Sequence, residues 1–164
     1  MLSACSNGNV EFYKDVKPEV KFEEFFSGDI VGWGIVQNWK GQVVRRFDIK
    51  MNGQWDGDKG ILYEDFFYYD GEEQKRVWTV VKKDGGAFEG TADDILGPAK
   101  GKTSGNAINW NYTMDLPVGG RTYRVKFDDW MWQMNDGVLI NRSYIKKFGV
   151  TVAELTLILQ KVEK

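Results

Sequence analysis

The chain has 164 residues, with 22 Lys and Arg against 24 Asp and Glu, and this length predicts one domain that buries its own core. The net charge of −2 argues against a nucleic-acid-binding protein, which usually presents a basic surface. The lack of histidine excludes histidine bases and metal sites, and the single cysteine excludes an internal disulfide and a cysteine zinc site. We therefore expect no metal and no cofactor.

The first residues resemble the site at which bacterial lipoproteins are cut and lipidated. Leu2, Ser3 and Ala4 precede Cys5, the only cysteine, and a polar spacer follows it. Cys5 is the predicted lipidation residue, and the alternative is a chance match in a free arm. No signal-peptide regions precede the motif, so we expect a truncated start or a misplaced start codon. Ser6 is similar to the residue that sorts lipoproteins to the outer membrane, and no run of about 18 apolar residues predicts a membrane span.

The chain divides into a flexible tether over residues 1–18 and a single domain over residues 19–164. The tether is polar and contains Gly8 and Pro18, and residues 21–26 predict a short helical turn that closes onto the core. The remainder is made of short segments with glycine-rich turns between them, which is typical of β-strands. The predicted strands span residues 30–37, 43–52, 60–69, 73–83, 87–95, 107–116, 121–134, 138–148 and 152–162.

These strands predict an antiparallel up-and-down β-barrel of about 8–9 strands, because the connections are short and sequential. Closure removes exposed edges, and a small barrel has room for side chains or for one small ligand. The last segment could also form a helix, but Thr156 and Ile158 favour a strand that closes the barrel.

Two Asp-Gly turns allow the pairing of the adjacent strands to be predicted. A two-residue turn at Asp70 places Asp65 opposite Arg76 and Tyr63 opposite Trp78. Opposite charges and paired aromatic rings are favourable cross-strand neighbours, so this register is the expected one.

The second turn, at Asp136, leaves two registers open. A two-residue turn places Asp129 opposite Tyr144, with Arg142 diagonal to Asp129, and this is the register we prefer. A three-residue turn would shift the pairing by one residue and place Trp130 opposite Arg142.

Several short motifs occur together, in a fixed order, from Phe25 to the C-terminus. They are Phe25-Phe26-Ser27-Gly28, Gly32-Trp33-Gly34, Val44-Arg45-Arg46-Phe47, Gly53-Gln54-Trp55-Asp56-Gly57, Arg76-Val77-Trp78-Thr79, Gly105-Asn106-Ala107, Phe127-Asp128-Asp129-Trp130-Met131 and Leu139-Ile140-Asn141-Arg142-Ser143. Together they resemble a family of proteobacterial lipoproteins that is defined only as a domain of unknown function. The resemblance implies an envelope lipoprotein with a lipocalin-like barrel and no established activity.

Asp129 is the main candidate for a polar group inside the barrel. It shares one face of its strand with Val125 and Phe127, so we expect it to point inward. A buried carboxylate needs a partner, and Arg142 and Tyr144 are the expected neighbours. The group is either the polar floor of a pocket or a structural ion pair that closes the barrel.

Arg45 and Arg46 lie on opposite faces of one strand, so one of them points inward. An inward arginine could bind the carboxylate of a fatty acid or stack on a tryptophan as packing. Most of the seven tryptophans are expected to fill the barrel and some to line a cavity, Trp78 among them. Trp33 follows Gly32 in the first strand and, by analogy with lipocalins, is expected to plug the barrel base.

The leading hypothesis is an envelope lipoprotein on the periplasmic face of the outer membrane whose barrel binds a lipophilic ligand such as a fatty acid. The alternatives are a structural or interaction module with a filled barrel and a lipid-modifying enzyme in which Asp129 and Tyr144 transfer protons. We expect no nucleic acid as a partner and assign no catalytic residue. The candidate ligand-binding residues are Arg45, Arg46, Trp78, Asp129, Arg142 and Tyr144.

Overall fold

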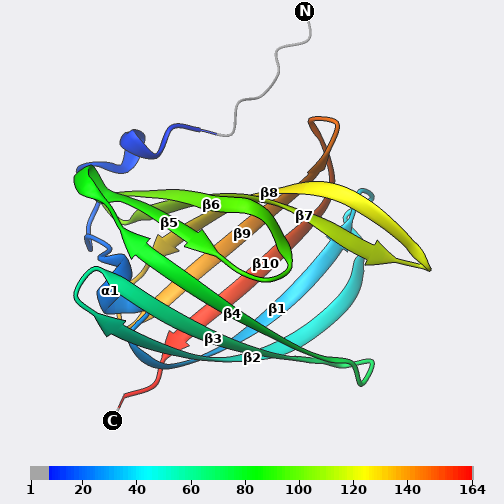
Figure 1. The fold of residues 1–164 in the computed structure, drawn as a ribbon, viewed down its shortest axis with the longest axis horizontal. Coiled ribbons are helices and arrows are strands. Elements are labelled where there is room, and N and C mark those ends of the chain that lie inside the picture. The colour runs from blue at the N-terminus through cyan, green and yellow to red at the C-terminus, as the bar shows by residue number, and fades with distance from the viewer. Residues whose placement is uncertain (1–7, 164) are drawn as a thin grey trace, which may run out of the picture.

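The computed structural model describes residues 8–163, which form a closed barrel of ten antiparallel strands (Figure 1). Each strand pairs with its neighbours in sequence, and the barrel closes where the last strand pairs with the first. The predicted up-and-down barrel is therefore confirmed. The strands are β1 (Gly28–Asn38), β2 (Val43–Asp56), β3 (Lys59–Tyr68), β4 (Glu73–Lys82), β5 (Ala87–Thr91), β6 (Ile95–Ser104), β7 (Ala107–Val118), β8 (Arg121–Gln133), β9 (Val138–Lys147) and β10 (Val150–Lys161). The short helices are η1 (Val10–Tyr13), α1 (Phe22–Phe25) and η2 (Asp84–Gly86).

The strand that the sequence did not predict is β6. Gly97 and Pro98, which indicate a turn, lie inside this strand. The pairing of β6 with β7 is irregular between Leu96 and Lys100, where Pro98 has no N–H to give to the ladder. The proline therefore marks an irregularity within a strand, and the barrel has one hairpin more than expected.

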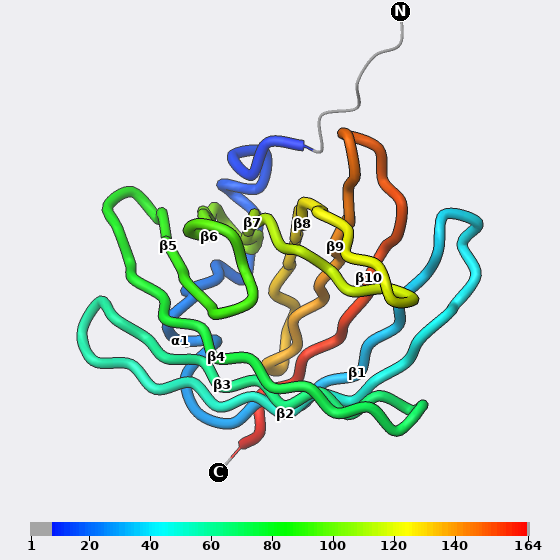
Figure 2. The backbone as a smooth tube through the Cα atoms, turned by 45° about the vertical axis from the view of Figure 1, so that its right-hand side comes forward, coloured from blue at the N-terminus to red at the C-terminus, as the bar shows by residue number. Residues whose placement is uncertain are grey.

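Helix α1 closes one end of the barrel, in agreement with the helical turn predicted for residues 21–26. Figure 2 shows this helix beneath β5 and β6. The ring of Phe22 lies 4.6 Å from the ring centroids of both Phe26 and Phe88, and 5.9 Å from that of Trp110. Gly53 allows this close approach, since a Cβ atom there would lie only 1.6 Å from the carbonyl oxygen of Phe26. This end of the interior is therefore filled with aromatic rings.

Lys161, at the end of β10, holds α1 against the barrel. Its Nζ atom donates hydrogen bonds to the carbonyl oxygens of Glu24, Phe25 and Ser27 at 2.9, 2.9 and 2.8 Å. Carbonyl groups at the end of a helix have no partner within it, and a lysine can supply one. The element that closes the barrel is thus fixed by the last strand.

The segment before α1 lies against the outer wall of the barrel (Figure 1). Val10 is buried against Trp130, and the ring of Tyr13 lies 6.2 Å from that of Trp130. A Cβ atom on Gly105 would lie 1.6 Å from the carbonyl oxygen of Tyr13, so a glycine is needed there. The polar composition gave no sign of this contact. Cys5 lies outside the described residues, and within residues 8–163 no helix combines the length and the apolar character needed to cross a bilayer.

The hairpin of β3 and β4 differs from its predicted register by one residue. Glu64, not Asp65, opposes Arg76, and Asp65 opposes Lys75. Gly71 has a φ of 94°, as in a three-residue loop that ends on a left-handed residue. Because a shift of one residue changes which side chains share a face, Glu64 and Arg76 both line the barrel interior.

The hairpin of β8 and β9 also has a three-residue loop, so the preferred register was wrong and the alternative was correct. Trp130 opposes Arg142, and Asp129 opposes Ser143. Asp136 has a φ of 57°, which an aspartate tolerates better than most residues. Arg142 consequently shares the outer face with Trp130 and is not a neighbour of Asp129.

Trp78 lies in the interior as expected but with another cross-strand partner, whereas Trp33 lies elsewhere than expected. Trp78 opposes Leu62 rather than Tyr63 and is buried in the interior. Trp33 is on the outer face of β1 with 52% of its surface exposed, so the predicted plug was wrong. Gly32 points inward in its place, and α1 fills the barrel end that Trp33 was expected to close.

Candidate ligand-binding cavity

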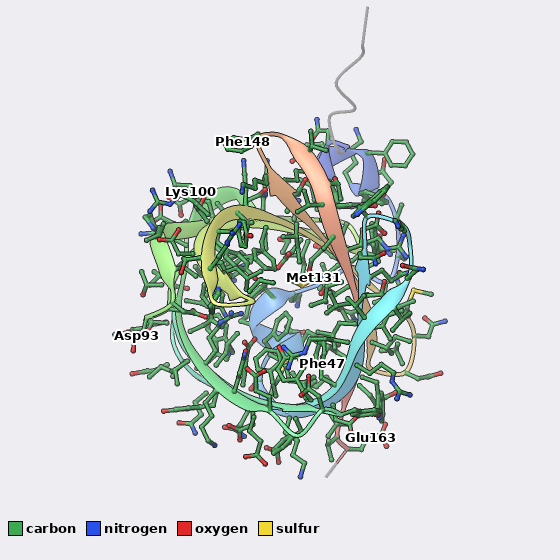
Figure 3. All side chains as sticks on the ribbon, turned by 90° about the vertical axis from the view of Figure 1, so that its right-hand side faces the viewer. Phe47, Asp93, Lys100, Met131, Phe148 and Glu163 are labelled. Atoms are coloured by element: carbon green, nitrogen blue, oxygen red, sulfur yellow. The ribbon has the colours of Figure 1, made fainter. Side chains whose placement is uncertain are left out.

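The barrel encloses a cavity of about 1140 Å³ that extends from α1 to the hairpin tips at the other end. Small-molecule sites usually have volumes of about 300–1,000 Å³, so this cavity is large enough for a sizeable ligand. In Figure 3, which looks in from the hairpin tips, Phe47 and Met131 lie on the inside of the wall while Phe148 lies at its outer edge. The walls are mostly apolar and include Ile49, Leu62, Val80, Met114, Phe127 and Leu157.

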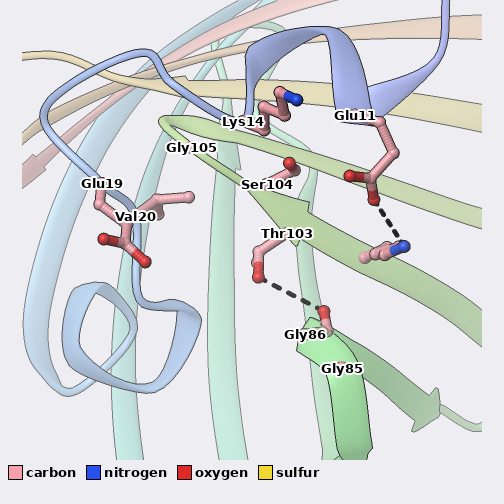
Figure 4. A pocket seen from close by; sticks show the side chains of 10 residues that line it. Glu11, Lys14, Glu19, Val20, Gly85, Gly86, Thr103, Ser104 and Gly105 are labelled. Atoms are coloured by element: carbon pink, nitrogen blue, oxygen red, sulfur yellow. Dashed lines mark hydrogen bonds and ion pairs between the residues drawn. The ribbon is translucent and has the colours of Figure 1, made fainter.

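A smaller depression of about 460 Å³ lies between the N-terminal segment and β6 (Figure 4). The carboxylate of Glu11 pairs with Nζ of Lys102 at 2.6 Å, and Oγ1 of Thr103 donates to the carbonyl oxygen of Gly86 at 3.3 Å. The ion pair is exposed to solvent, so it contributes little to stability. Its polar side chains already have partners, which makes this depression a weaker candidate than the barrel interior.

Arg76 is a largely buried cation that lines the cavity. Its Nε and Nη2 atoms donate to the carboxylate of Asp94 at 2.9 and 2.7 Å. The guanidinium also lies 5.9 and 5.7 Å from the ring centroids of Phe66 and Trp78, within the range of cation–π attraction. Its Nη1 atom is 4.0 Å from Oε2 of Glu64, which is too far for a hydrogen bond. Asp94 is therefore the main counter-ion of Arg76.

Two carboxyl groups line the middle of the cavity, on β3 and β8. Burial raises the pKa of Glu64 from 4.5 to about 7, against the opposing effects of Arg76 and a hydrogen bond from Trp78. Burial likewise raises the pKa of Asp129 from 3.8 to about 7, although a hydrogen bond from Ser143 acts against it. Oε2 of Glu64 and Oδ1 of Asp129 are buried without a hydrogen-bond partner among the described residues. Each carboxyl therefore has an oxygen that a ligand could satisfy.

Tyr112 adds a hydroxyl group to this interior. Burial and the nearby charge of Asp129 raise its pKa well above the usual value, so the phenol stays neutral at physiological pH. Its ring stacks on Phe127 with centroids 4.8 Å apart and meets the edge of Trp78 at 5.3 Å. The polar groups are thus framed by aromatic rings on two sides.

Of the two arginines on β2, Arg45 lines the cavity near its mouth, and Arg46 is exposed on the outer face. The guanidinium of Arg45 donates to Asp70 at 3.1 Å and to Glu72 at 2.7 Å, and it lies 3.6 Å from the ring centroid of Tyr68. Two carboxylates already neutralise Arg45, so it is poorly suited to bind the carboxylate of a fatty acid.

Arg142 and Tyr144 lie on the outer wall, away from Asp129. Arg142 is 3.6 Å from the carboxylate of Glu154, and Tyr144 packs beside Trp130. The predicted proton-transfer pair of Asp129 and Tyr144 is therefore not assembled. Of the six predicted ligand-binding residues, the cavity brings together Arg45, Trp78 and Asp129.

Glu64, Arg76 and Tyr112 are interior polar residues that the sequence analysis missed, as are Asp94, Asn141 and Ser143. One signal was available for Arg76, because it lies two residues from Trp78 and must share its face. Glu64 could be placed inside only with the correct hairpin register. Among residues 8–163, no three acidic or cysteine side chains are grouped as metal ligands would be.

Comparison with known proteins places the chain in a family. The model of the family described as "Protein of unknown function (DUF3833)" matches residues 1–161, a range that includes all ten strands. No match was found among curated proteins. The resemblance to a family defined only as a domain of unknown function is thereby confirmed, and the chain belongs to the DUF3833 family.

Proposed function

We propose that this protein binds a lipophilic molecule inside its barrel and is held at the bacterial envelope by a lipid on Cys5. The observation that carries the first part is the cavity of about 1140 Å³, whose apolar walls surround a small polar group. Ligand sites generally have this composition, with a few polar groups that fix the orientation of an apolar body.

The cavity also argues against a filled barrel. Aromatic rings close the α1 end of the barrel. They leave the middle of the barrel and the opposite end, at the hairpin tips, open. An apolar surface of this kind is unfavourable in contact with water, so a ligand that covers it would stabilise the protein.

Native mass spectrometry of the protein purified from bacteria, followed by solvent extraction, tests the binding function. We expect a stoichiometric lipophilic adduct, or uptake of one added alkyl compound per chain. A clean mass without uptake of any such compound would remove the binding proposal.

A pair of variants on β10 makes this test specific for the cavity. Ala153 lines the cavity near its mouth, whereas Ile158 points outward. Ala153→Phe should abolish or strongly reduce the adduct, while Ile158→Phe should retain it. Circular dichroism and a melting curve should show that both variants are folded.

The anchoring function is supported by the Leu2-Ser3-Ala4-Cys5 motif and by the absence of any other cysteine. Cys5→Ser in a precursor with a complete signal peptide should move the protein from the membrane fraction to the soluble periplasmic fraction. If the variant stays in the membrane fraction, Cys5 is not the anchor.

A further inference from the structure

The charges inside the barrel do not balance within the protein. The double hydrogen bond between Arg76 and Asp94 neutralises one positive and one negative charge. Glu64 and Asp129 remain, and among residues 8–163 no cation other than Arg76, which is 4.0 Å from Oε2 of Glu64, is paired with either of their unpartnered oxygens. Trp78 and Ser143 each donate one hydrogen bond to these carboxyls, but neither donor carries a charge. A buried carboxylate that keeps one oxygen without a donor is unfavourable, so a proton or an external donor would stabilise both groups.

Asp129 carries this argument furthest. Only 7% of its surface is exposed, it lines the cavity, and its Oδ1 atom has no partner among the described residues. The groups that act on it are Ser143, Arg76, Tyr112 and Glu64 from other strands and Asp128 from its own. Those that act on Glu64 are Arg76, Trp78 and Asp94. Apart from Arg76, none of these groups is a cation.

An ammonium group has the chemistry that this site lacks. It carries three N–H donors and one positive charge, and Glu64 and Asp129 line the same cavity and act on each other electrostatically, so one ammonium group can serve as the shared cation. The rings of Trp78, Tyr112 and Phe127 line the same cavity, and aromatic rings can stabilise a cation that lies over a free face. The remaining apolar walls can take an alkyl or other apolar body.

We propose that the cavity binds a lipophilic amine, with its ammonium group between Glu64 and Asp129 and its apolar part along the barrel wall. This inference rests on the proposed ligand-binding function and specifies the class of ligand. It excludes a free fatty acid as the preferred ligand. The carboxyl group of a fatty acid would enter a site where Glu64 and Asp129 already lack a cation of their own, because Arg76 is paired with Asp94.

Three twelve-carbon compounds with different polar ends test the proposal. Binding of dodecylamine, dodecanol and dodecanoate is measured by calorimetry at pH 6 and pH 8.5, below their aggregation concentrations. Dodecylamine remains protonated at both values, since an alkyl amine has a pKa of about 10.4. Its affinity should rise about tenfold or more towards pH 8.5, because Glu64 and Asp129 ionise near pH 7. The affinity of dodecanol should change little, and that of dodecanoate should fall.

A double variant, Glu64→Gln with Asp129→Asn, should lose at least tenfold in dodecylamine affinity at pH 8.5 and retain dodecanol binding. Asp65→Asn is the matched control, because Asp65 follows Glu64 but pairs with Lys75 outside the barrel at 2.8 Å. The control should leave the affinities for all three compounds unchanged.

The outcomes separate this inference from the proposed function. If dodecanol binds but dodecanoate binds more tightly than dodecylamine at pH 8.5, the inference is wrong and the binding function stands. A dodecylamine affinity that is independent of pH, or that survives in the double variant, also overturns the inference. If none of the three compounds binds, both proposals fail.

Discussion

The inner and the outer face of the barrel wall treat the same kind of side chain differently, and two adjacent aspartates show this most clearly. Asp128 points outward and accepts hydrogen bonds from Asn109 at 2.9 Å and from Lys146 at 3.0 Å. Asp129 points inward, where burial raises its pKa to about 7 and its Oδ1 atom has no partner within residues 8–163. The outer carboxylate is held by hydrogen bonds in the wall, whereas the inner one keeps an oxygen whose hydrogen-bonding capacity is unused among the described residues.

The tryptophans follow the same division. Trp110 is buried in the interior, and Gly90 and Gly101 leave room for its ring. Trp33 is half exposed on the outer face. The comparison indicates that the inner face contributes most to stability at the α1 end and carries the site of the proposed ligand, while the outer face contributes less to stability. Four substitutions test this difference between the faces.

Trp110→Ala should have the largest effect. The ring packs against Phe22 and Trp78, and the space around Gly101 cannot collapse to fill the void because the strands fix it. We expect a loss of about 3–5 kcal/mol in the free energy of unfolding, measured in urea. A loss below about 1 kcal/mol would show that the aromatic cluster does not support the closed end.

Asp129→Asn should change the dependence of stability on pH. The carboxyl has a pKa of 3.8 in the unfolded reference and about 7 in the folded protein, so the folded state binds the proton more tightly. The contribution of the protonated Asp129 carboxyl to the free energy of unfolding is complete below pH 3.8 and is lost as the pH rises through about 7. This difference amounts to at most about 4 kcal/mol. The variant should therefore gain about 2–4 kcal/mol relative to the wild type between pH 4 and pH 8, as measured by urea unfolding. If the difference in unfolding free energy between the variant and the wild type is the same at pH 4 and at pH 8, the buried position of Asp129 is contradicted.

Asp128→Asn is the outer counterpart and should act in the opposite direction at neutral pH. The substitution removes the negative charge from the ion pair between Asp128 and Lys146, which is largely buried. We expect a loss of about 1–2 kcal/mol at pH 7, from the same urea measurements. A gain in stability at pH 8 would mean that the two faces do not differ as described.

Trp33→Ala should have the smallest effect. Because 52% of this residue is exposed, its removal leaves no enclosed void. The expected loss is about 1 kcal/mol or less, seen as a small shift of the melting temperature. A loss comparable with that of Trp110→Ala would place Trp33 in the core after all.

The fold could be predicted from the sequence, because alternating segments and glycine turns specify an antiparallel barrel whatever the details of each loop. The register could not. Asp70-Gly71 is compatible with both a two-residue and a three-residue loop, since Gly71 takes a positive φ in either. The difference of one residue in loop length determines whether Glu64 or Asp65 lies opposite Arg76.

The candidate site was predictable only in part for the same reason. Asp129 was placed inside by the alternation along its own strand, which needs no knowledge of the partner strand. Arg142 and Tyr144 were placed by a register that proved wrong. That Glu64 and Asp129 line one cavity depends on the closure of the whole barrel, which no local sequence pattern can indicate.

The bonds of Lys161 to α1 have a consequence for the synthesis of the protein. Lys161 and Glu24 are 137 residues apart in the chain, and the seam between β1 and β10 joins residues that are about as distant. Contacts of this separation make folding slow, because the chain must close a long loop before they form. The barrel can therefore close, and its first helix be fixed, only after the ribosome has released the last strand.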